Sequence, residues 1–313
     1  MKRLGWFVLL FVCLLMIAGY AVWVVRNPER EVLDDRARTA APGAFATLPA
    51  GKVHYELAGP AGGRVAVLVH GFSVPGYIWE PTFRRLQREG FRVLRFDTFG
   101  RGWSDRPDAA YDGPFYSAQI DGLLAELGIR GPVDLLGLSF GGFIVAHYAA
   151  THPERIRTLT LVDPLTAGRK VPWRYALPGI GGWFYQVAVV PGLADNLMGD
   201  FLHPERFPRW ADGYRTQMRY PGFGRALRRT MLAAERADFP ALYREIERAS
   251  YPVLLVWGRE DAVLPLAGAE RIRSVVTRTE FLVVDEAGHL PQMERPDVFE
   301  PRLLAFLRAV PTP

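Results

Sequence analysis

Short apolar segments that alternate with helical patterns are the feature that most constrains the fold of this 313-residue chain. Such alternation is typical of a mostly parallel β-sheet with helices on both faces. The first two of eight predicted strands meet at Ala50-Gly51 and form a hairpin. Strands are predicted at 45–49, 52–57, 65–69, 91–96, 133–136, 156–162, 253–257 and 281–284. Helices are predicted at 78–89, 117–127, 143–151, 266–275 and 296–309, the second of them capped by Ser117.

The alternation stops at residue 164 and resumes near residue 251. The intervening stretch is rich in aromatic residues and proline and contains several helix-like pieces. We therefore predict one α/β domain, built from residues 44–163 and 251–313, that is interrupted by a mainly helical insertion at 164–250. A charged and then Ala- and Pro-rich stretch at 27–43 is predicted to be a linker that follows an N-terminal segment, residues 1–26.

The N-terminal segment contains twenty residues without a charge, Trp6–Val25. As a helix this stretch is about 30 Å long, which matches the hydrocarbon core of a bilayer. A cleaved signal peptide has a shorter apolar region and small residues at its cleavage site, whereas Trp23-Val24-Val25-Arg26 stands here. We therefore predict an uncleaved, single-pass membrane anchor. Basic residues flank both of its ends, so the side of the membrane that the domain faces stays open.

Positive charge is unevenly distributed along the chain. The net charge of +5 is accounted for by Leu165–Glu245, which holds twelve Lys or Arg and seven Asp or Glu. Such an excess suits an anionic membrane surface or an acidic ligand, and equally a set of solvated arginines. No dense Lys/Arg cluster or nucleic-acid-reading motif is present, which argues against nucleic-acid binding. The single cysteine, Cys13, argues against an intrachain disulfide and a cysteine-ligated metal site.

One serine stands between glycines directly after an apolar segment, in Gly137-Leu138-Ser139-Phe140-Gly141-Gly142. A G-x-S-x-G string between a strand and a helix is typical of a nucleophile elbow, a strained turn that exposes the serine hydroxyl above the sheet. Small residues are needed two positions before and after the serine, because side chains there would collide with the neighbouring helix and strand. Ser139 is therefore the candidate nucleophile.

A serine hydroxyl becomes a good nucleophile when a base removes its proton. His289 is the candidate base, because it follows the last predicted strand and so lies past the carboxyl end of that strand. Asp261, four residues past the strand that ends at Trp257, is the candidate acid that orients the imidazole. The chain order serine, aspartate, histidine is one of the known triad orders. The alternatives for the acid are Glu260, Asp163 and Asp285.

Two backbone N–H groups are needed to stabilise the oxyanion that forms when an acyl carbon is attacked. Phe140, directly after the serine, is one predicted donor. Phe72, in the His70-Gly71-Phe72 loop after the strand at 65–69, is the other. His70 itself is predicted to fix this loop by a hydrogen bond rather than to take part in catalysis. Structural or surface positions are predicted for His54, His147, His152 and His203.

Five motifs in this order resemble the α/β-hydrolase superfamily: VLVHGFS, RFDTFGRGWSD, GLSFGG, VWGREDAVLP and DEAGHLPQMERP. The resemblance covers residues 44–310 and is greatest to the serine lipases and esterases. The membrane span together with HGFS is similar to the membrane-anchored monoacylglycerol lipases. The resemblance implies that the insertion is a cap over the pocket. Phe140 departs from the family motif, in which methionine is common at this position. The roles it implies are Ser139 as nucleophile, Asp261 as acid, His289 as base, and Phe72 and Phe140 as oxyanion donors.

Three hypotheses on function follow from the resemblance. The first is a membrane-anchored carboxylic-ester hydrolase that needs no cofactor or metal and takes a lipophilic, mono-acylated substrate from the bilayer. The second is a hydrolase of carbon–carbon bonds in ring-cleavage products, a related group that also uses serine. The third is a tethered binding protein without enzymatic activity, since a fold does not fix a function. The sequence does not indicate an oligomeric state.

Overall fold

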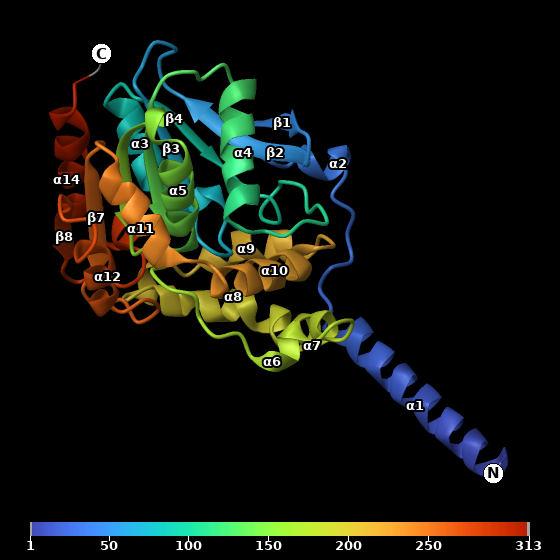
Figure 1. Ribbon diagram of the computed structural model, residues 1–313. Coiled ribbons are helices and arrows are strands. Elements are labelled where there is room, and N and C mark those ends of the chain that lie inside the picture. The colour runs from blue at the N-terminus through green and yellow to red at the C-terminus, as the bar shows by residue number, and fades with distance from the viewer. Residues whose placement is uncertain (1, 312–313) are drawn as a thin grey trace.

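The sheet of the computed structural model, which describes residues 2–311, has the strand order β1-β2-β4-β3-β5-β6-β7-β8 (Figure 1). β1 with β2 and β2 with β4 are antiparallel pairs, and the other pairs are parallel. The strands are β1 (Ala44–Leu48), β2 (Gly51–Ala58), β3 (Val65–Val69), β4 (Arg92–Phe96), β5 (Val133–Leu138), β6 (Ile156–Val162), β7 (Val253–Gly258) and β8 (Glu280–Val284). The predicted hairpin and mostly parallel sheet are confirmed.

Helices cover both faces of the sheet because its strands are apolar on both sides. In β3, Val67 and Val69 belong to one buried cluster, whereas Ala66 and Leu68 belong to the other. The first cluster includes residues of α4 and α5, and the second includes residues of α3 and α14. The helices of the α/β domain are α3 (Glu80–Arg88), α4 (Gly113–Glu126), α5 (Phe140–Thr151), α12 (Ala269–Arg273), α13 (Pro291–Glu294) and α14 (Pro296–Ala309).

Helix α4 begins four residues earlier than predicted, and the prediction that Ser117 caps it is wrong. The N-cap is Asp112, whose carboxylate accepts the N–H of Phe115. Pro114 lies in the first turn, where a helix needs no N–H donor, and this was the signal for the earlier start. Ser117 lies inside the helix, with its Oγ 2.8 Å from Nδ1 of His147.

The insertion between β6 and β7 is mainly helical, as predicted, and most of it lies across one end of the sheet (Figure 1). Its last helix, α11, instead packs beside α5 of the α/β domain. The rest of the insertion, its helices and the segments that join them, is called the cap below. The helices of the insertion are α6 (Trp173–Ala176), α7 (Gly181–Ala188), α8 (Leu193–Asn196), α9 (Trp210–Met218), α10 (Phe223–Glu235) and α11 (Phe239–Arg248).

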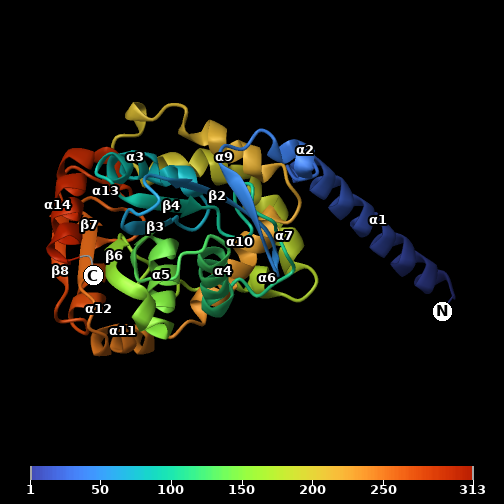
Figure 2. The same cartoon turned by 90° about the horizontal axis from the view of Figure 1, so that it is seen from above.

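The N-terminal helix α1 (Lys2–Arg26) projects from the cap end of the molecule (Figures 1 and 2). Among residues 2–311, Arg3–Arg26 is the one helix long and apolar enough to cross a membrane, a test that a signal sequence also passes. The stretch that follows contains α2 (Asp35–Arg38) and is tied to the cap. The Glu29 carboxylate accepts the N–H groups of Gly222 and Gly224, each over 2.7 Å, and so satisfies donors at the start of α10.

Candidate active site

Ser139 lies in the turn between β5 and α5, with φ 57° and ψ −120°. A residue with a Cβ in such a conformation costs about 1–3 kcal/mol and persists only where its surroundings hold it. Three backbone hydrogen bonds hold it here. The Ser139 N–H donates to Val162, and the Ser139 carbonyl accepts from Gly142 and Leu165. The turn therefore has the strained form of a nucleophile elbow.

The two glycines that flank this turn have no room for a side chain. A Cβ on Gly137 would overlap the backbone of Gly141, and a Cβ on Gly141 would overlap the carbonyl of His70. The close approach lets α5 begin directly after Ser139, so that the positive end of the helix dipole lies beside the serine.

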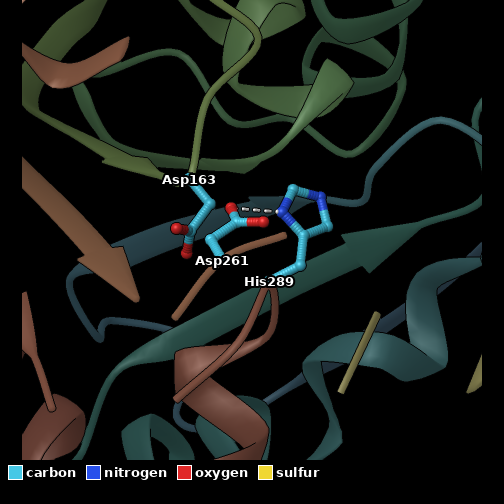
Figure 3. A group of neighbouring side chains, drawn as sticks. All are labelled: Asp163, Asp261 and His289. Atoms are coloured by element: carbon cyan, nitrogen blue, oxygen red, sulfur yellow. Dashed lines mark hydrogen bonds and ion pairs between the residues drawn. The ribbon is translucent and has the colours of Figure 1, made fainter. Parts of the chain in front are cut away.

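His289 follows β8 and Asp261 follows β7, and their side chains meet (Figure 3). Nδ1 of His289 donates to Oδ2 of Asp261 over 2.7 Å, and both residues are buried. Oδ1 of Asp261 accepts the N–H groups of Val263 and Leu264, each over 2.8 Å. Three donors hold this carboxylate as an acceptor, and Nε2 of His289 is left for another partner.

Two of the alternative acids point elsewhere. Glu260 accepts the N–H of Ala287 over 3.1 Å, and Asp285 forms a surface ion pair with Arg259. Neither is the carboxylate that binds the imidazole.

Asp163, the third alternative, lies on the far side of Asp261 from His289 (Figure 3). Its Oδ1 accepts the N–H of Gly258 over 2.9 Å, and its buried Oδ2 has no hydrogen-bond partner within residues 2–311. Burial and the charge of Asp261 raise the pKa of Asp163 well above its usual value. One oxygen or nitrogen from each of Asp163, Asp261 and His289 lies within 4.8 Å of the others, a spacing that a cation could bridge. The three donors on Asp261 favour a hydrogen-bonded chain instead.

The electrostatic surroundings favour a protonated imidazole at His289. Burial alone lowers the pKa of His289, but the hydrogen bond and the charge of Asp261 outweigh burial and raise the pKa above its usual 6.5. Asp200 of the cap adds a further negative charge, although burial raises its own pKa to about 6. An imidazolium that forms during a reaction is therefore stabilised.

The cap holds the loop that carries His289. The carbonyl of Asp200 accepts the His289 N–H over 2.9 Å. The buried carboxylate of Glu294 accepts the N–H of Gly288 over 2.7 Å, and it also accepts from Leu202 of the cap over 2.8 Å. The position of the imidazole thus depends on the insertion as well as on the sheet.

The backbone N–H groups of Phe72 and Phe140 have no backbone acceptor within the described part of the chain. Both residues line the same cavity as Ser139. Their rings make an edge-to-face contact, with centroids 6.3 Å apart. N–H groups that lack a partner beside a serine hydroxyl suit a developing oxyanion.

His70 fixes the loop that carries Phe72, as predicted. Its Nδ1 donates to the carbonyl of Gly71 over 2.9 Å, and its Nε2 accepts the N–H of Thr98 over 2.9 Å. Burial lowers the pKa of His70 to about 4, so the ring is neutral and both of its nitrogens are occupied.

Ser139 opens into a cavity of about 320 Å³ that lies between the α/β domain and the cap. Its walls are mostly apolar, with Leu165 and Met231 contributed by the insertion. Its charged lining residues, Arg169 and Lys170, are also exposed to solvent and so lie at its mouth. A largely apolar cavity beside a serine suits an acyl chain or another lipophilic group.

Comparisons with known proteins agree with this fold. The family described as alpha/beta hydrolase fold matches residues 65–296. A pimeloyl-[acyl-carrier protein] methyl ester esterase of Neisseria meningitidis serogroup B (strain H44/76) is 28% identical over 238 residues, which are 74% of this chain and 88% of the esterase. A 2-hydroxymuconate semialdehyde hydrolase of Pseudomonas putida is 29% identical over 269 residues, 77% of this chain and 86% of that one. The structure of a thermophilic esterase from Thermogutta terrifontis is 25% identical, with a TM-score of 0.73, and the match covers 87% of this chain and all of that one.

Proposed function

Because this chain belongs to the α/β-hydrolase fold family, we propose that it hydrolyses carboxylic esters of lipophilic substrates. In this proposal Ser139 is the nucleophile, His289 is the general base and acid, and Asp261 orients the imidazole. The backbone N–H groups of Phe72 and Phe140 bind the oxyanion. The observation that carries the proposal is the strained turn of Ser139, which shares a cavity with two N–H groups that have no backbone partner within residues 2–311.

The proposed reaction has two steps and an acyl-enzyme between them. Nε2 of His289 takes the hydroxyl proton of Ser139 while Oγ attacks the acyl carbon. The imidazolium, stabilised by Asp261, then protonates the leaving alcohol as the ester C–O bond breaks. In the second step His289 takes a proton from water, which attacks the acyl group, and returns that proton to the Ser139 oxygen as the carboxylic acid leaves.

Replacement of Ser139 by alanine tests the mechanism. The wild-type protein should hydrolyse p-nitrophenyl esters, and Ser139→Ala should lose about 10⁴- to 10⁶-fold in kcat. A fluorophosphonate probe should label the wild type and leave the variant unlabelled. Full activity of Ser139→Ala would overturn the mechanism, and failure to label the wild type would favour a tethered binding protein.

The cavity and the N-terminal helix together support a substrate that comes from a membrane. The walls of the cavity suit an acyl chain, and α1 would hold the cap close to lipid as a single-pass anchor. Hydrolysis rates for p-nitrophenyl esters of graded chain length will measure the acyl preference. Intact mass will test the anchor, because an uncleaved chain keeps its mass of 35.1 kDa and a processed chain loses its N-terminal segment.

A second candidate reaction is the hydrolysis of a carbon–carbon bond in a ring-cleavage product. Similarity to a hydrolase named for 2-hydroxymuconate semialdehyde favours it. The apolar helix α1 argues for the ester reaction, because a small soluble semialdehyde needs no membrane-bound enzyme. A ring-cleavage product assayed beside the p-nitrophenyl esters will separate the two reactions.

A further inference from the structure

The cap contacts the apolar N-terminal helix well before that helix ends. The indole N–H of Trp183, in α7, donates to the carbonyl oxygen of Gly19 over 3.1 Å. Nearer the end of α1, Nε of Arg26 donates to the carbonyl of Val187 over 3.1 Å. Gly19 and Arg26 are separated by about 10 Å along the helix axis. Helix α7 therefore runs beside the last two turns of α1.

This contact sets the depth of α7 in a bilayer that α1 spans. The charge-free stretch Leu4–Val25 has 22 residues. Its length as a helix is about 33 Å, and the hydrocarbon core is about 30 Å thick. With Arg3 and Arg26 at the two interfaces, Gly19 lies roughly 10 Å below the headgroups, at the depth reached by interfacial helices. The Trp183 ring, which binds there, is of the type that favours this zone.

The cap residues 168–184, here called the α6–α7 edge, have the composition of a membrane-contacting surface. Trp173 is 74% exposed and Ile180 is 49% exposed. Residues 164–194 contain no Asp or Glu. Exposed apolar side chains next to cations are typical of segments that bind anionic lipid surfaces. The cationic residues of the edge, all exposed, are Arg169, Lys170 and Arg174.

We propose that the α6–α7 edge docks into the headgroup region of an anionic bilayer, in the leaflet where α1 ends. Arg169 and Lys170 belong both to this edge and to the lining of the Ser139 cavity, so docking places the mouth of the cavity against lipid. A lipophilic substrate then enters without crossing water. The inference rests on the proposed membrane anchoring by α1 and is independent of the bond that the enzyme cleaves.

Quenching of a fluorescent probe in the full-length protein tests the docking. The native Cys13, within α1, carries an NBD probe that reports on the anchor. In a Cys13→Ser background the probe is moved to Trp173→Cys or Ile180→Cys, and for a control to Arg130→Cys, an exposed position before β5. Each protein is reconstituted in vesicles of phosphatidylcholine and phosphatidylglycerol that contain a nitroxide lipid, labelled either near the headgroup or within the acyl chain.

The acyl-chain nitroxide should quench the probe at position 13. The headgroup nitroxide should quench the probes at 173 and 180 at least about twofold more than the probe at 130. Quenching at 173 and 180 should be weaker in vesicles in which phosphatidylcholine replaces phosphatidylglycerol. Quenching at 13 without quenching at 173 and 180 would overturn the docking and leave the anchor. Absence of quenching at 13 would overturn both. Equal quenching at 173 and 180 in the two lipid mixtures would overturn the preference for anionic lipid. Ester hydrolysis is measured separately on each sample, so its failure is distinguishable from failure to dock.

Discussion

Asp163 and Asp261 bring two buried carboxyl groups close together, and His289 binds the second of them (Figure 3). Two carboxylates so close and shielded from water cannot both stay ionised. Asp261 accepts three hydrogen bonds, whereas Asp163 accepts one and has a pKa that burial and the charge of Asp261 raise well above the usual value. The unequal hydrogen bonding and the raised pKa of Asp163 favour Asp163 as the protonated member of the pair, with a proton that it can donate to Asp261.

Asp163→Asn should keep ester hydrolysis within about threefold of the wild type, because an amide can accept from Gly258 and donate to Asp261. The urea midpoint of Asp163→Asn should also be higher than that of the wild type at pH 8. The pKa of Asp163 in the folded protein lies above the usual 3.8, so wild-type stability falls as the pH rises from 3.8 towards the raised pKa. The advantage of the variant in urea midpoint should thus be small at pH 4 and clear at pH 8.

Asp163→Ala is the control for this prediction. It leaves the Gly258 N–H without its carboxylate acceptor and removes the proton that Asp163 can donate to Asp261, and it should cost about 1–3 kcal/mol in the free energy of unfolding. If Asp163→Asn is folded but inactive, Asp163 works as an ionised acid, and its assignment as the neutral member is wrong.

The activity should depend on pH through His289. A general base must be neutral, so kcat/KM should rise with pH through the His289 pKa, with a midpoint above 6.5 because Asp261 raises that pKa against the effect of burial. Asp261→Asn should lower kcat/KM about 10⁴-fold and move the midpoint down. Asp285→Asn, at the surface, should leave the profile unchanged. A wild-type midpoint below 6.5 would contradict the prediction.

The sequence predicted the positions of Ser139, Asp261 and His289 because strand patterns show where each strand ends, and the carboxyl ends of parallel strands meet at one edge. It offered Asp163 merely as an alternative acid. The position of Asp163 beside Asp261 depends on the parallel register of β6 with β7, in which Val162 pairs with Val256. Apolar patterning does not define this register. The hydrogen bond from Gly222, at the start of α10, to Glu29 could not be predicted either. The two residues lie 193 positions apart, and the local sequence of 27–43 is typical of a linker.

His54, which the sequence placed in the hairpin, is buried, and its Nδ1 hydrogen-bonds to Oδ2 of the buried Asp97 over 2.8 Å. Burial alone lowers the pKa of His54, but the charge of Asp97 outweighs it and raises the pKa above 6.5. The stabilisation is therefore fully present below pH 6.5 and is lost as the pH rises through the raised pKa. His54→Gln should lower the unfolding temperature more at pH 6 than at pH 9, whereas the partly exposed His152→Gln should have little effect at either pH. An equal loss for His54→Gln at both pH values would refute the charged pair.

Glu29 should couple the N-terminal segment to the cavity through α10. Glu29→Ala leaves two N–H groups at the start of this helix without their acceptor and should cost about 1–2 kcal/mol in the free energy of unfolding, measured in detergent. The control is Glu31→Ala, whose exposed ion pair with Arg219 at 3.4 Å should contribute little. Because α10 also carries Met231 and Ala234 into the cavity, Glu29→Ala should raise KM for long-chain esters more than for short-chain esters. If Glu29→Ala and Glu31→Ala behave alike in stability and in KM, the segment does not hold the cap in place.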